Sequence, residues 1–159
     1  MQSNRSIVNE ELTSLRERIA ANIIGQGSNA TGKTIRSLAV EVYGTDTTPV
    51  GILYGRPYFG ALETGSRPWQ NAERFRRFVP RVFAEQIQEW IDAKHLDLNA
   101  YAVAHNIIIR GTSLYREGGR NSIYSREIPA TLDRIRERLL LECQLQVVNN
   151  IKLNTDETI

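Results

Sequence analysis

The residues whose types and spacing come nearest to catalytic chemistry match the phosphate-binding pattern G-x-x-x-x-G-K-[ST]. Residues 27–34 read Gly27-Ser28-Asn29-Ala30-Thr31-Gly32-Lys33-Thr34. In nucleotide hydrolases a buried strand leads into this loop and a helix leaves it, so that backbone N–H groups point at the phosphates. Here a helical pattern precedes the loop and a strand pattern follows it. A turn is therefore favoured, and a nucleotide hydrolase that uses Lys33 and Thr34 is the alternative.

The other candidates for catalysis or metal binding are two histidines, three serines and three acids: His95, His105, Ser66, Ser113, Ser125, Glu41, Asp46 and Glu63. Neither histidine has a cysteine or a second histidine at the spacing of metal ligands. No serine lies in a recognisable nucleophile elbow, and no spacing of the acids singles out a nuclease metal site. We therefore expect no catalytic residue, no metal and no cofactor, and predict that the chain is not an enzyme.

Positive charge and aromatic rings are concentrated in one stretch of the chain, which holds Arg67, Arg74, Arg76, Arg77 and Arg81 with Trp69, Phe75 and Phe78 between them. Such a mixture can bind phosphates while its rings stack on bases. It is also typical of protein interfaces, where arginine and aromatic residues are enriched. A solvated loop that packs its own rings is the third interpretation. The alternative function here is a small nucleic-acid-binding module.

Composition limits the class of protein. The chain has 159 residues, 41% of them hydrophobic and 24% charged, which suits one globular domain. The net charge of +2 argues against wholesale coating of nucleic acid. No basic segment followed by an apolar run begins the chain, and no window is apolar enough for a membrane span, so we expect an unexported protein outside the membrane. The single cysteine, Cys143, excludes an internal disulfide and is expected to be a small buried residue of a helix.

The first half of the chain predicts a helix and a hairpin. Apolar residues recur at three- and four-residue steps from Ile7 to Ile23, with charged residues between them, and the pattern ends near Gly25. In residues 38–43 apolar residues then occupy every second position, as in a half-buried strand. A polar break follows, and residues 50–54 form a second strand-like run. The two runs predict an antiparallel hairpin with a loose loop.

The second half predicts three more helices. One covers residues 80–94 with Pro80 as its first residue, and one covers about residues 99–110 before Gly111. Residues 114–124 predict a loop that is mobile or ordered by a partner. The last helix carries an apolar stripe, which we expect to bury on its own domain and which consists of Ile128, Leu132, Ile135, Leu139, Cys143, Val147 and Ile151. The fold class is α+β, a single domain over residues 1–159 with a small antiparallel sheet, amphipathic helices on one side of it, and a long C-terminal helix.

The order of these blocks supports a family resemblance. The blocks are residues 29–38, the hairpin, residues 58–68, residues 87–91, residues 100–104 and residues 110–112. In this order they resemble the neck, tail-completion and minor-tail proteins of tailed bacteriophages, especially those of phages and prophages of gut Bacteroidetes. The most typical motif is Leu62-Glu63-Thr64-Gly65. The chain departs from the family where Trp69 and the arginine-rich stretch follow Pro68 in place of a shorter turn of small residues.

The resemblance implies a structural virion protein that is not an enzyme. It implies a homo-oligomeric ring at the phage head-tail junction, twelvefold below a portal or sixfold as a tail terminator, assembled in the host cytoplasm. The implied partners are the portal and other neck or tail proteins, with non-specific contact to DNA in the channel. The residues expected at interfaces are Tyr58, Phe59, Leu62, Glu63, Arg67, Trp69, Arg74, Arg76, Arg77, Arg116, Arg120, Leu140 and Leu141.

Overall fold

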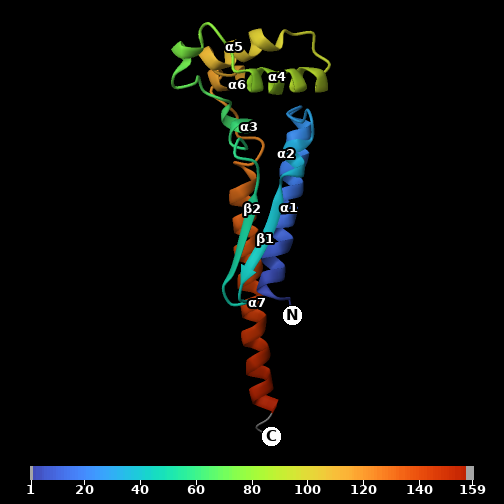
Figure 1. Ribbon diagram of the computed structural model, residues 1–159. Helices are drawn as coiled ribbons and strands as arrows, with labels where there is room; N and C mark the ends of the chain where they lie inside the picture. The colour runs from blue at the N-terminus through green and yellow to red at the C-terminus, as the bar shows by residue number, and fades with distance from the viewer. Residues whose placement is uncertain (1, 157–159) are drawn as a thin grey trace.

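The protein is a long stalk with a helical head at one end (Figure 1). The computed structural model describes residues 2–156, and side chains for residues 2–148. The stalk consists of helix α1 (Asn4–Gly25), strands β1 (Ala39–Gly44) and β2 (Pro49–Tyr54), and helix α7 (Glu127–Asp156). The head holds η1 (Ala72–Phe75), α4 (Arg81–Ala93), α5 (Ala100–Arg110) and α6 (Ser113–Arg116). None of the described helices has a stretch that is long and apolar enough to cross a membrane.

Helix α1 is the centre of the stalk, because the hairpin and α7 both pack on it. Its buried side chains repeat every fourth residue, and Leu15, Ile19 and Ile23 form the main core with Leu38 and Ile123. The predicted N-terminal helix is confirmed, and it ends at Gly25 as expected but begins at Asn4, three residues before the apolar pattern. Its first turn is held by the hairpin loop, where Asp46 accepts hydrogen bonds from the Ser3 hydroxyl and, at 3.1 Å, from the Arg5 N–H. The carboxylate thus satisfies a donor that the start of a helix leaves unpaired.

The predicted hairpin is also confirmed, with Ala39 opposite Tyr54 and Gly44 opposite Pro49. Its orientation depends on Gly51, because a Cβ atom there would lie 2.4 Å from the Leu12 side chain of α1. Gly51 therefore faces α1, and since side chains alternate along a strand, its neighbours on either side face away. The antiparallel pair and the surrounding helices confirm the α+β class.

Helix α7 packs on α1 in a way that the sequence did not predict. The α7 face against α1 is polar and includes Thr131, which is 1% exposed. The apolar stripe is largely exposed instead, with Ile128 at 40% and Leu132 at 59%. The prediction that this stripe buries on its own domain is wrong for Ile128, Leu132, Cys143 and Val147, which are exposed, whereas Ile135 and Leu139 are half-buried. Ile151 lies outside the residues whose side chains are described.

The head has a small core of its own, built from Val79, Ala84, Ala104 and Ile108. The two predicted helices of this region are confirmed as α4 and α5. Pro80 immediately precedes α4. The Asn99 side chain caps α5 by accepting a hydrogen bond of 3.0 Å from the Ala102 N–H, as asparagine commonly does at this position.

Candidate assembly interface

The joint between stalk and head is organised by Glu63, in the short helix α3 (Ala61–Thr64). Its side chain is 2% exposed. One carboxylate oxygen accepts the backbone N–H groups of Ile123 and Tyr124, both at 2.7 Å, and of Ser125 at 3.1 Å. The other oxygen accepts the Ser125 hydroxyl. One carboxylate therefore fixes the chain just before α7 begins.

The charged state of Glu63 is the favoured one in the folded protein. Burial alone would raise the pKa of this carboxyl group. The hydrogen bonds from Ser125, Tyr124 and Ile123 outweigh that effect, and the net pKa lies below the ordinary value of 4.5. The motif residue that suggested a protein interface is thus an internal anchor of the chain.

The segment predicted as a mobile or partner-ordered loop is fixed within the chain. Residues 114–124 contain the end of α6, and Ile123 is fully buried in the stalk core. Arg120 donates from its backbone to the Glu63 carbonyl at 2.8 Å and from its side chain to the Leu62 carbonyl at 2.9 Å. Its guanidinium also reaches the Ser28 hydroxyl. The prediction of a mobile loop was wrong because these long-range hydrogen bonds hold a glycine-rich segment that sequence alone leaves unconstrained.

The expected interface residues divide into two groups in the structure. Phe59, Leu62, Glu63, Trp69 and Arg120 make contacts inside the chain: Phe59 and Leu62 pack on the stalk core, and Trp69 packs against head aromatics. The exposed group comprises Tyr58, Arg67, Arg74, Arg76, Arg77, Arg116, Leu140 and Leu141. This second group is available to a partner.

The outer side of the hairpin is an exposed apolar surface that sequence reasoning missed. It is formed by Tyr43, Val50, Ile52 and Tyr54, with Glu41 as its charged residue; we call it the hairpin face. Burial raises the pKa of Tyr54, and so does the Glu41 carboxylate, which carries a negative charge beside the hydroxyl. The signal in the sequence was that both alternating faces of the strands are largely apolar, a pattern typical of a sheet covered on both sides.

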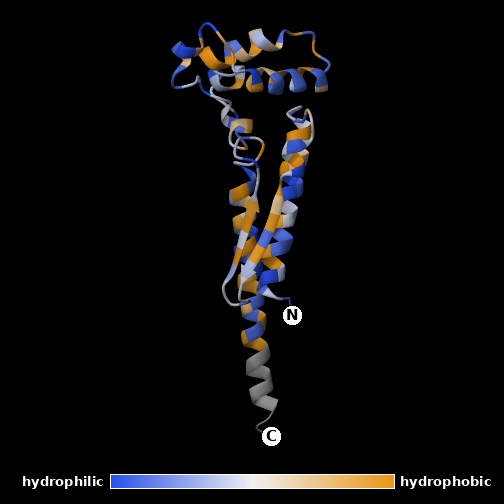
Figure 2. Ribbon diagram, in the orientation of Figure 1, coloured by the Kyte–Doolittle hydropathy of each residue, from blue (hydrophilic) through white to orange (hydrophobic). Residues whose placement is uncertain are grey.

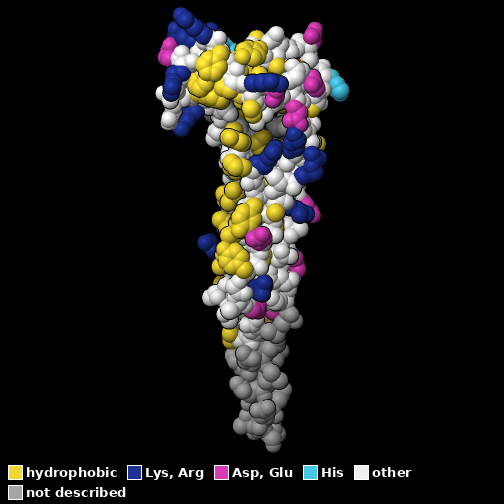
Figure 3. Space-filling model, in the orientation of Figure 1, with side chains coloured by type: hydrophobic (Ala, Val, Ile, Leu, Met, Phe, Trp, Pro, Cys, Tyr) yellow, Lys and Arg dark blue, Asp and Glu magenta, His cyan; other side chains and the backbone are white. Residues whose placement is uncertain are grey.

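A second apolar surface runs along α7. It consists of Ile128, Leu132, Leu140, Cys143 and Val147, all exposed, with Arg136 among them; we call it the α7 stripe. Figure 2 shows the hairpin as mostly hydrophobic, whereas hydrophobic and hydrophilic residues alternate along the described part of α7. In the space-filling view hydrophobic side chains gather along the stalk below the head (Figure 3). Exposed patches of this extent typically mark interaction sites.

The two apolar surfaces border a groove of about 460 Å³. Its floor is the α1 core, at Leu15 and Ile19, and its walls include Tyr54, Ile128 and Leu132. The groove exists because the hairpin and α7 cover different sides of α1. The stalk core is therefore open to an apolar partner along this side.

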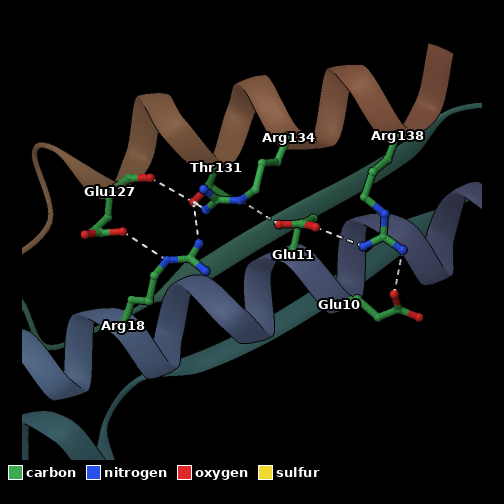
Figure 4. A network of polar contacts seen from close by, with 7 residues as sticks. All are labelled: Glu10, Glu11, Arg18, Glu127, Thr131, Arg134 and Arg138. Atoms are coloured by element: carbon green, nitrogen blue, oxygen red, sulfur yellow. Dashed lines mark hydrogen bonds and ion pairs between the residues drawn. The ribbon is translucent and has the colours of Figure 1, made fainter. Parts of the chain in front are cut away.

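The seam between α1 and α7 explains why the apolar stripe is left outside. Glu11 of α1 accepts hydrogen bonds from Arg134 at 3.1 Å and from Arg138 at 2.9 Å, and Arg18 pairs with Glu127 at 2.9 Å (Figure 4). Burial raises the pKa of Glu11, but the two arginines outweigh it and lower the pKa overall. Charged hydrogen bonds orient α7 with its polar face inward.

The arginine-rich stretch lies in the head, and its rings pack on one another. Trp69 meets Phe75 edge-on with ring centroids 5.1 Å apart, and also contacts Phe83 at 5.2 Å. Arg76 pairs with Glu73 at 2.7 Å on the surface. Arg81 pairs with Glu85 at 2.7 Å. The exposed guanidiniums of Arg67, Arg74 and Arg77 suit phosphate or carboxylate groups of a partner.

The loop with the phosphate-binding pattern lies between α1 and the four-residue helix α2 (Lys33–Arg36), so the strand that such a loop requires does not precede it. Lys33 forms an ion pair with Glu89 of α4. Lys94 donates to the Gly27 carbonyl at 2.6 Å and to the Asn29 carbonyl at 2.8 Å. In this structure the loop joins α1 to α2 and holds the end of the stalk against the head through these contacts.

The histidines and acids considered above lie apart from one another. His105 contacts the Arg76 carbonyl at 3.1 Å, and Asp46 is at the hairpin loop far along the stalk from Glu63. Among the residues that the structure describes, no group of three histidine, cysteine or acidic side chains has the arrangement of a metal site.

Comparison with protein-family models, with curated proteins and with solved structures finds no match to this chain.

Proposed function

We propose that the chain is a structural subunit of a tailed-phage virion, which assembles into a closed ring at the head-tail junction. The observation that carries this proposal is the orientation of α7. The helix buries a polar face on its own α1 and leaves its apolar stripe exposed beside an apolar hairpin face. A monomer that stays a monomer rarely exposes apolar surface along the length of its stalk.

Two different exposed faces on one subunit make ring formation possible. When one face of a subunit meets a different face of the next, the contact is heterologous, and a ring results if the rotation closes. The order of the sequence blocks supports the position in a neck or tail-completion ring. The portal and other neck or tail proteins are the proposed partners, and the head arginines would contact DNA in the channel through its phosphates.

The experiment is to determine the mass of the purified protein by light scattering and to image it by electron microscopy. We expect closed rings of one symmetry. Mass spectrometry of purified virions of the source phage should then find the chain among the structural proteins. A protein that remains monomeric at high concentration and is absent from virions would contradict the proposal.

A further inference from the structure

We propose that the hairpin face of one subunit packs on the α7 stripe of the next copy of this chain, with Glu41 paired to Arg136. The inference rests on the proposed self-assembly and names the two surfaces that join. Both surfaces belong to the stalk, so they can meet when neighbouring stalks stand side by side.

The first argument is that one apolar face of the hairpin has no cover within the described chain. Exposed apolar surface of this kind typically marks a contact with a partner. One side of this hairpin is covered by α1, where Gly51 allows the close approach. The other side leaves Tyr43 and Tyr54 nearly half exposed. A helix with an apolar stripe would cover it.

The second argument is charge complementarity. Of the six outward positions of the hairpin, 39, 41, 43, 50, 52 and 54, only Glu41 is charged. Of the six positions of the α7 stripe, 128, 132, 136, 140, 143 and 147, only Arg136 is charged. The two charges are opposite, and each surface is otherwise apolar or uncharged. Such an arrangement favours the pairing of the two different surfaces and disfavours the pairing of either surface with itself.

The third argument is that the residues on either side of the charge are similarly spaced on the two surfaces. Glu41 lies midway between Ala39 and Tyr43, which span about 13 Å of strand. Arg136 lies midway between Leu132 and Leu140, which span about 12 Å of helix. When the two charges are opposite each other, the apolar residues on both sides of them therefore meet as well.

Arg136 is free to turn toward a partner. Its side chain is 77% exposed, and among the described residues it pairs with Asp133, at 4.0 Å. A surface contact of that length contributes little to stability. Pairing with Glu41 at an interface shielded by apolar residues would be stronger, because less water screens the charges there.

The test uses two single charge reversals, Glu41→Arg and Arg136→Glu, each in the full chain. Each variant alone presents like charges at every contact, and we expect self-association about tenfold weaker or more. An equimolar mixture of the two offers opposite charges at both contacts of each subunit. The mixture should restore assembly to within about threefold of the wild type, in rings where the two variants alternate.

Matched controls change charge by the same amount away from the two surfaces. Glu137→Arg alters the residue next to Arg136, about 100° around the helix. Arg126→Glu alters an exposed residue before α7 begins. Both controls should assemble like the wild type. Cys143 provides a readout without any substitution, because it lies in the α7 stripe and should react with a maleimide in dissociated subunits but be protected in rings.

The outcomes separate this pairing from the ring proposal itself. If the wild type forms rings, the pairing would be overturned by single variants that assemble normally, by a mixture that fails to restore assembly, or by a Cys143 that stays reactive in the rings. Each of these results would overturn the pairing but not the ring proposal. A wild-type chain that forms no ring would overturn both. Loss of assembly in each single variant, rescue on mixing and protection of Cys143 would together establish the contact.

Discussion

Replacing Glu63 by alanine should destabilise the protein more than any other single change at the joint between stalk and head. The carboxylate accepts three backbone N–H groups of residues 123–125 and one hydroxyl. Glu63→Ala would leave those donors facing an apolar methyl group. Ile123 is fully buried, so its N–H has no route to water without local unfolding.

The magnitude follows from the burial of each donor. A buried donor left without an acceptor costs about 1–3 kcal/mol, and the two partly buried ones belong at the lower end of that range. The sum is about 3–5 kcal/mol, a large fraction of the stability of a typical domain. At this chain length such a loss corresponds to a fall in Tm of about 6–20 °C.

Glu63→Gln separates charge from shape. The amide keeps one oxygen for the backbone donors, and we expect a cost of about 1–2 kcal/mol because neutral acceptors are weaker. Folding lowers the pKa of Glu63, so its ionised carboxylate stabilises the folded protein at any pH above the pKa of the unfolded state. This stabilisation is lost as the pH falls through the lower pKa of the folded state. The difference in the free energy of unfolding between wild type and Glu63→Gln should therefore be largest at pH 7 and shrink below pH 4.5.

The assay is urea unfolding followed by circular dichroism, at pH 7 and at pH 3.5–5. The exposed Glu117→Ala, from the same segment, is the control and should stay within about 0.5 kcal/mol of the wild type. If Glu63→Ala were as stable as that control, the carboxylate would not be the anchor of this joint, and the account of how α7 is positioned would be refuted.

Three further changes test other parts of the structure. Gly65→Ala should cost about 2–4 kcal/mol in urea unfolding, because φ is +68° and a Cβ would lie 2.4 Å from the backbone of α6, whereas Gly118→Ala, also at positive φ but in open space, should cost only about 1 kcal/mol. Glu11→Gln should cost about 1–2 kcal/mol at pH 7, because two arginines of α7 lose a charged partner. Since folding lowers the pKa of Glu11, the difference in stability between variant and wild type should diminish below pH 4.5. A variant as stable as the wild type at both neutral and acid pH would contradict this. Lys33→Ala should change stability by less than about 1 kcal/mol, because its pair with Glu89 is at the surface, and calorimetric titration with ATP should show no binding in wild type or variant; binding that is lost in the variant would favour the nucleotide hydrolase instead.

The local elements could be predicted from the sequence because each depends on contacts between near neighbours. The periodicity from Ile7 to Ile23 marks α1, and the alternation of residues 38–54 marks the hairpin. Asn99 and Gly111 mark the ends of α5 through their own backbone preferences. These signals need no knowledge of the tertiary structure.

The candidate interface was predicted only in part. The exposure of Tyr58, Leu140 and Leu141 agrees with a role at a surface. The motif residue Glu63 and the segment around Arg120 turned out to bind each other inside the chain. A short-range pattern cannot distinguish a carboxylate that meets a partner from one that meets backbone sixty residues later.

The sequence by itself determined that α7 is a helix with apolar residues at helical spacing, since that depends only on the helical repeat. Which face of the helix turns inward was decided by the tertiary structure. Glu11, placed in the buried row of α1, binds Arg134 and Arg138, and this pairing rotates α7 so that charges meet charges. The physical reason is that a carboxylate buried at this seam needs cationic partners more than the stripe needs burial, and only the packed stalk brings those groups together.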